Sequence, residues 1–243
     1  MKAFFDDLVA KFTLDFIEGD RWMFITSGLK VTLIVAVLSV IFGILIGMLV
    51  AIIRCGYDQA SKKEQKSVAG FFVGILAFIC RVYITIIRGT PTLVQLLIMY
   101  FIIMVTCDSK ITVAVITFSI NSGAYVSEIF RGGIMSVDKG QMEAGRSLGF
   151  SYFTTMKLVV LPQAIRTCLP SLVNELITLL KETSICGYIG LNELTRGGDI
   201  IRGTTFDAML PLLVVAAIYL VMVMGLGKAF DLLERRLRAS DIR

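Results

Sequence analysis

The chain has 243 residues, of which 56% are hydrophobic and only 18% are charged, and its mean hydropathy is +0.81. A water-soluble domain carries about 25% charged residues, so this composition excludes a soluble protein. The sequence contains no histidine, which excludes imidazole-based catalysis and histidine metal sites. Its five cysteines form no CxxC pair and lie mostly in apolar segments, so we interpret them as buried hydrophobic side chains.

Residues 1–23 are predicted to form an extracytoplasmic N-terminal segment. Apolar and acidic positions alternate over residues 4–20, a pattern typical of an amphipathic helix at a membrane surface, and a solvated tail is the alternative. The segment lacks the basic start of a signal peptide, and the apolar run that follows is too long for one.

Five membrane crossings are predicted within residues 24–236, because a crossing needs about 20 mostly apolar residues. The clearest are the uncharged runs 31–53 and 208–227. The five predicted spans cover residues 24–54, 67–106, 110–131, 164–182 and 207–230.

The second span follows from parity, since the chain must cross the membrane an even number of times between two loops on the same side. Three apolar stretches lie between the basic segments 54–66 and 131–166. We therefore expect residues 67–106 to form one helix bent at Pro91, which disfavours helix at the residue before it. Arg81 and Arg88 are then expected to reach lipid headgroups. A re-entrant segment at 68–90 is the alternative.

The orientation follows from the basic residues, which gather in the segments 54–66, 131–166 and 228–243. Basic loops stay in the cytoplasm, so the N-terminus is predicted outside and the tail 237–243 inside. The net charge of +5 is thus explained by a polarised membrane protein, and we expect no nucleic-acid binding.

The predicted cytoplasmic loop 132–163 is polar but patterned. Residues 143–149 indicate a short helix that ends at Gly149. Pro162 is predicted in the first turn of the next helix, where its missing N–H costs nothing. The residues alone leave two readings open: a docking element or a connector that lies on headgroups.

The spacing EA-x4-G-x9-V-x-LP in this loop resembles the EAA loop of ATP-binding-cassette (ABC) importer permeases, and residues 28 to about 235 are similar to the permeases for polar amino acids. The family usually has alanine where this chain has Gly145 and often proline where it has Asp138. We expect the glycine to loosen the helix. Further matching stretches begin at Gly28, Arg88, Asn121, Glu128, Lys139, Asn174 and Leu180.

This resemblance implies an all-α membrane protein with the five-helix type I (MetI-like) permease fold, in the bacterial inner membrane and in contact with lipid. It also implies the partners: a dimer of ABC ATPase subunits, an extracytoplasmic amino acid-binding protein and a second permease chain, either a copy or a paralogue. ATP and Mg would be bound by the ATPase, so no cofactor, metal or catalytic residue is expected here. The residues implied to couple to the ATPase are Gln141, Glu143, Ala144, Gly149 and Pro162.

Polar side chains inside the predicted spans are candidate ligands for the substrate, because such groups are costly in a membrane. Each could instead tie helices together. For Glu128, which lies beside Arg131, a structural ion pair is the favoured interpretation. The candidate substrate ligands are Gln95, Asn121, Ser122, Asn174, Glu175 and Ser184.

The predicted function is that of a permease subunit that imports a polar or charged amino acid by alternating access, driven by the ATPase. The alternative is an ATP-independent secondary transporter or channel, against which stand only five spans and no visible internal repeat. The sequence does not identify the amino acid. The segment 183–206 is implied to face the binding protein, with a plain connector as the alternative, and Gly43-x3-Gly47 is interpreted as close packing within the chain.

Overall fold

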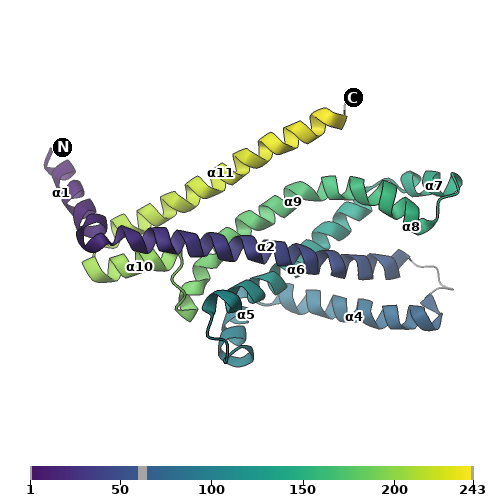
Figure 1. The fold of residues 1–243 in the computed structure, drawn as a ribbon, viewed down its shortest axis with the longest axis horizontal. Coiled ribbons are helices and arrows are strands. Elements are labelled where there is room, and N and C mark those ends of the chain that lie inside the picture. Colours follow the sequence, from purple (N-terminus) through teal and green to yellow (C-terminus); the bar gives the residue numbers. More distant parts are fainter. Residues whose placement is uncertain (1, 60–64, 242–243) are drawn as a thin grey trace. The chain divides into compact units, whose positions relative to one another are not determined.

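The computed structural model describes residues 2–59 and 65–241, and within these ranges every regular element is helical (Figure 1). Parts of the predicted basic loop (60–64) and of the tail (242–243) lie outside the described residues. The elements are α1 (Lys2–Phe12), η1 (Thr13–Ile17), η2 (Glu18–Asp20), α2 (Trp22–Gln59), α4 (Val68–Gly89), α5 (Thr92–Ile98), η3 (Met99–Ile103), α6 (Lys110–Ser136), α7 (Lys139–Ser147), α8 (Tyr152–Thr155), η4 (Met156–Val160), α9 (Leu161–Glu182), η5 (Thr183–Ile189), α10 (Leu194–Thr205) and α11 (Met209–Asp241).

Five helical stretches among the described residues are long and apolar enough to cross a membrane, which confirms the predicted number of spans. A twelve-residue apolar helix, Thr92–Ile103, is too short to count among them. The five stretches are Trp22–Asp58, Val68–Gly89, Lys110–Ser136, Met156–Ile189 and Met209–Leu232.

The helix is interrupted at the proline of the second predicted span. α4 ends at Gly89, Thr90 is extended (φ −123°, ψ 147°), and α5 begins at Thr92. This is the conformation that Pro91 imposes on the residue before it. Whether α4 is the lower part of one span or a re-entrant segment stays a prediction.

Two arginines of α4 have protein partners where the sequence led us to expect lipid headgroups. Arg81 forms an ion pair of 2.5 Å with Asp58 of α2. The Arg88 guanidinium lies 5.2 Å from the centre of the Tyr125 ring on α6, a cation–π contact. Both contacts fasten α4 to its neighbours.

The contacts divide the chain into two compact units. Unit one contains residues 1–38, 93–117 and 176–243, and unit two contains residues 39–92 and 118–175. The helices α2, α6 and α9 contribute residues to both units.

The core of unit one lies where α10 packs against α11 and the start of α2. A Cβ atom on Gly197 of α10 would lie only 2.5 Å from the backbone oxygen of Phe24, so the two backbones are in direct contact. Five buried side chains fill this core: Phe16, Ile25, Leu194, Ile201 and Val215.

Unit two is held together by close packing of α2 on α6. A Cβ atom on Gly43 would lie 2.8 Å from Cβ of Ser122, and one on Gly47 would lie 2.6 Å from Cγ1 of Val126. The two glycines therefore allow helix contact within the chain, which confirms the interpretation of Gly43-x3-Gly47. Small side chains continue this contact at Ala51 and Ala124, both buried.

Candidate functional site

Helix α7 contains the first part of the EAA-like motif, and its start is capped. Oδ1 of Asp138 accepts a hydrogen bond of 2.6 Å from the backbone N–H of Gly140. This is a standard N-cap interaction, so Asp138 favours the start of the helix. The proline that the family often has here also favours a helix start. The side chains of Gln141, Glu143 and Ala144 are exposed on α7, where a partner could contact them.

Helix α7 ends in a turn that depends on glycine. Gly149 has φ +85°, in the left-handed region that side chains disfavour. The backbone N–H of Leu148 still bonds to Ala144 and that of Phe150 to Gly145, at 3.1 Å each, which closes the last turn. The predicted end of the helix at Gly149 is confirmed.

Gly145 has a structural reason that we did not expect from the sequence. A Cβ atom at this position would overlap the Thr155 side chain of α8, which is fully buried. The glycine thus lets α8 pack directly on α7 (Figure 1). Glycine is less favourable than alanine in a helix, but alanine at this position would disturb the close contact with α8. The prediction that Gly145 only loosens the helix was therefore incomplete.

Pro162 lies in the first turn of α9, which begins at Leu161, as predicted, but the expected turn before this helix is absent. Helix already begins at Tyr152 and continues through α8 and η4 into α9. η4 is a π-helical turn directly before the proline, in which the N–H of Leu161 bonds to the carbonyl of Met156, five residues back. A wider turn gives room to a residue without an N–H, so the helix continues through it.

Glu128 on α6 forms the expected structural ion pair. Its Oε2 accepts a hydrogen bond of 2.8 Å from Nε of Arg131, and its Oε1 pairs with the guanidinium of Arg54 on α2. The second partner was missed because it lies 74 residues away in the sequence. The carboxylate thereby joins α2 to α6.

Unit two brings two of the candidate substrate ligands together. The half-buried carboxyl group of Glu175 on α9 lies near Ser122 on α6, whose buried hydroxyl has no hydrogen-bond partner among the described residues. Asn121, the neighbour of Ser122, is only 2% exposed, whereas Asn174 is exposed. An acid, a hydroxyl and an amide of this kind can bind the ammonium and polar groups of an amino acid.

The other two candidates belong to unit one. Gln95 is half-buried on α5. Ser184 borders a cavity of about 320 Å³ that Arg196 and Asp199 also line. Asp199 forms ion pairs of 2.7 Å with Arg196 and 2.5 Å with Arg202, and the hydrogen bond from Arg202 holds its pKa below the ordinary range.

Glu193, which we did not select from the sequence, is 1% exposed and organises the start of α10. Its carboxylate accepts hydrogen bonds from the backbone N–H of Arg196 (2.7 Å) and Thr195 (2.8 Å) and from the Tyr219 hydroxyl (3.2 Å). Burial raises its pKa. A Cβ atom on Gly28 would lie 2.7 Å from the Glu193 carbonyl oxygen, so α2 encloses the cap. Only its place just before a helix could have indicated this role.

Metal binding has no support in the part of the chain that the structure describes. No group of three or more cysteine, aspartate or glutamate side chains in residues 2–59 and 65–241 could hold an ion.

Comparison with known families gives a match over most of the chain. Residues 67–239 match the family described as "Binding-protein-dependent transport system inner membrane component".

Several relatives have similar length. The glutamine transport system permease protein of Escherichia coli K12 is 38% identical over 216 residues, which is 87% of this chain and 92% of the relative. The arginine transport system permease protein of Bacillus subtilis is 37% identical over 221 residues, 90% and 94% of the two chains. A putative glutamine transport system permease protein of Rickettsia conorii is 39% identical over 217 residues, 88% and 93%.

Solved structures agree with this fold. An amino acid ABC transporter crystallised with histidines is 40% identical, has a TM-score of 0.76 and is matched over 88% of this chain and 94% of its own. The inward-facing MetNI methionine ABC transporter is 18% identical with a TM-score of 0.74, over 90% and 98% of the two chains, and so supports the fold alone.

Proposed function

This chain belongs to the family of binding-protein-dependent transport system inner membrane components. From that premise we propose which steps of import this chain performs and which its partners perform. The chain is a multi-pass inner-membrane protein with the MetI-like fold and acts as a permease of an amino acid ABC importer. Its family is a transport permease and not a catalytic enzyme. ATP hydrolysis, with ATP and Mg, belongs in this proposal to a separate ATPase dimer.

In this proposal α7 docks on the ATPase from the cytoplasmic side, with the N-terminus outside and the C-terminus inside. The observation that carries it is the exposed, capped helix α7, ended by Gly149 and packed on α8 through Gly145. Side chains exposed on a short rigid helix can enter a groove of a partner without a prior folding cost. Gln141, Glu143 and Ala144 make the contact, while Gly149 and Pro162 shape the chain that follows.

The substrate site is proposed around Glu175. Its carboxyl group and the Ser122 hydroxyl, with Asn121 and Asn174 beside them, offer acceptors for an ammonium group and donors for a carboxylate. Gln95 and Ser184 are proposed as further ligands along the path.

The names of the relatives support a polar amino acid of the glutamine or arginine type as the substrate. A second permease chain, identical or paralogous, completes the transporter in this proposal. An extracytoplasmic binding protein delivers the amino acid to the face that contains α10.

Reconstitution tests the function. The chain, its co-purified ATPase and its binding protein are placed in liposomes, and uptake of labelled glutamine and arginine is followed with and without ATP. We expect uptake that depends on ATP and on all partners. Uptake by the chain alone, without ATP, would instead indicate a secondary transporter.

Glu175→Gln tests the substrate site. We expect slower uptake, because the neutral amide pairs more weakly with an ammonium group, with unchanged assembly of the complex. Thr167→Val, an exposed change on the same helix, is the control and should transport normally. Unaltered uptake kinetics in Glu175→Gln would assign the residue a structural role.

Glu143→Lys tests the docking surface. We expect loss of ATPase co-purification with normal membrane insertion. Lys157→Glu, which reverses a charge on the exposed surface of η4, is the control for a general charge effect. Retention of the ATPase by Glu143→Lys would contradict the proposed role of this residue.

A further inference from the structure

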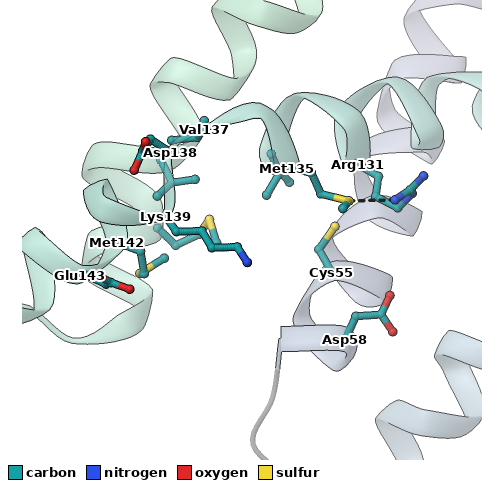
Figure 2. A pocket seen from close by; sticks show the side chains of 12 residues that line it. Cys55, Asp58, Arg131, Met135, Val137, Asp138, Lys139, Met142 and Glu143 are labelled. Carbon is teal, nitrogen blue, oxygen red and sulfur yellow. Dashed lines mark hydrogen bonds between the residues drawn. The ribbon is translucent and has the colours of Figure 1, made fainter.

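A cavity of about 570 Å³ lies within unit two, beside α7, the helix proposed to dock on the ATPase and called here the coupling helix (Figure 2). The ends of α2 and α6, the first half of α7 and the η4 turn line it. The volume falls within the range of about 300–1,000 Å³ that is usual for small-molecule sites. The proposed transport through Glu175 does not use this cavity, and the proposed docking of α7 uses one residue of its wall, Glu143.

The apolar part of the wall is soft. Met135, Met142 and Met156 contribute three thioethers, and Cys55 adds a thiol. Flexible, polarizable side chains of this kind adapt to apolar groups of different shape. The wall can therefore accommodate the apolar part of a small amphiphile and does not require one particular ligand shape.

Most charged groups at the cavity already have partners in the protein. Asp58 is paired with Arg81, Asp138 caps the backbone of Gly140, and Arg131 is held by Glu128. None of these groups depends on a ligand for its neutralisation.

Two charges of opposite sign remain, Lys139 and Glu143, one turn apart on α7. Within the described residues neither charged group forms a hydrogen bond or an ion pair, not even with the other. Figure 2 shows the Lys139 ammonium extending from α7 into the space that faces Cys55 and Asp58 at the end of α2. A purely anionic ligand would meet three acids in the wall, and a purely cationic one would meet Lys139 and Arg131.

We propose that this cavity binds a small zwitterion with an apolar stem, its anionic group on Lys139 and its ammonium group on Glu143. Free amino acids and the phosphoethanolamine headgroup of a phospholipid share this chemistry. A ligand held here fastens α7 to the ends of α2 and α6, so its presence changes how freely the coupling helix moves. The docking proposed for α7 would also engage Glu143, so the ligand and the ATPase would compete for this carboxylate. The proposal therefore concerns binding to the permease without its ATPase, and it stands whether or not Glu175 contacts the transported amino acid.

Cys55 serves as a reporter, because it lines the cavity and is only 8% exposed. In the full-length permease the cysteines at 80, 107, 168 and 186 are replaced by alanine, and the rate at which a small methanethiosulfonate reagent labels Cys55 is measured. The protein is held in nanodiscs with or without phosphatidylethanolamine. Millimolar L-glutamine, L-arginine or phosphoethanolamine is then added.

We expect at least one zwitterion to slow the labelling about fivefold, as occupancy shields the thiol. Protection by free L-glutamine or L-arginine without phosphatidylethanolamine identifies an amino acid as the ligand. Protection that appears only with the lipid or with phosphoethanolamine identifies the headgroup. Lys139→Gln should weaken either protection about tenfold, the loss of one charge-assisted hydrogen bond.

Lys157→Gln, on η4 but outside the cavity wall, is the matched control and should keep full protection. A Glu175→Gln variant should also keep it. The proposal is overturned if no zwitterion protects Cys55, or if protection survives Lys139→Gln and is lost in Glu175→Gln. If Cys55 resists the reagent in every condition, equilibrium binding of radiolabelled L-glutamine and of phosphoethanolamine to the same variants decides by the same criteria.

Discussion

Each unit contains a buried or half-buried glutamate with a structural role, and the two carboxylates are stabilised by different kinds of partner. In unit two, Glu128 meets the guanidinium groups of Arg54 and Arg131. In unit one, Glu193 meets two backbone amides and the hydroxyl of Tyr219. All members of an ion-pair network can be replaced together by apolar side chains. Backbone amides cannot be replaced, so they lose their acceptor when the glutamate is substituted. The region around Glu193 should therefore be the less tolerant of the two.

The largest effect is expected for Glu193→Ala. The change leaves two amides at the start of α10 without an acceptor in a buried place, and we expect a loss of about 3 kcal/mol in the free energy of unfolding. Thermal unfolding in detergent measures it. Glu193→Gln keeps one acceptor and should lose only about 1 kcal/mol, so equal losses in the two variants would contradict the capping role.

The ion-pair network of unit two should respond less strongly and be replaceable. Glu128→Leu leaves two arginines without their acid and should cost about 2 kcal/mol, a value reduced by their partial exposure. Adding Arg54→Met and Arg131→Met should recover most of this loss. If the triple variant is as unstable as the single one, the contrast between the two units is wrong.

Gly145→Ala examines a purely steric contact in unit two. The added methyl group meets Thr155, and we expect a loss of about 1 kcal/mol that outweighs the gain in helix propensity. Thr155→Ala in the same chain should reverse the sign, so that alanine at 145 becomes neutral or stabilising. The rate of proteolysis within α7 and α8 measures both effects, and simple additivity of the two changes would exclude the contact.

The smallest effects concern pH, and they have opposite signs at two acids of unit one. The pKa of Asp199 is lowered by Arg202, so its contribution to stability is complete above the ordinary carboxyl pKa and is lost as the pH falls through the lowered value. The pKa of Glu193 is raised by burial, so its contribution is complete at low pH and declines as the pH rises through the raised value.

Unfolding temperatures between about pH 6 and about pH 3 measure both contributions against Asp199→Asn and Glu193→Gln. The advantage of the natural residue should shrink toward low pH at Asp199 and toward high pH at Glu193. If the advantage of the natural residue changed with pH in the same direction at both positions, the proposed difference between the surroundings of Asp199 and Glu193 would be wrong.

The sequence predicts the membrane helices well because lipid imposes a length and a composition on each span. The break at Pro91 and the end of α7 at Gly149 follow from backbone rules that act locally. The exposed surface of α7, which carries Glu143, was identified by its motif.

Contacts between distant residues could not be predicted in the same way. Arg54 pairs with an acid 74 positions later, and Glu193 resembles any loop residue until its amides and Tyr219 are placed. The helix that precedes Pro162 from Tyr152 could not be predicted either, because it continues through a π turn that avoids the steric conflict a regular turn would create. The role of Gln95 and Ser184 as substrate ligands stays a prediction.

The continuous helix through Pro162 has a mechanical consequence. Within unit two, helix runs without a break from Tyr152, which follows the turn after α7, to Glu175. At 1.5 Å per residue this stretch is about 36 Å long. Such a rod transmits force along its axis, and a rotation of about 10° at one end would carry the other by about 6 Å. A push on α8 therefore becomes a displacement of the acid at the far end, with the π turn and Pro170, which lacks a backbone N–H inside α9, as softer joints between them.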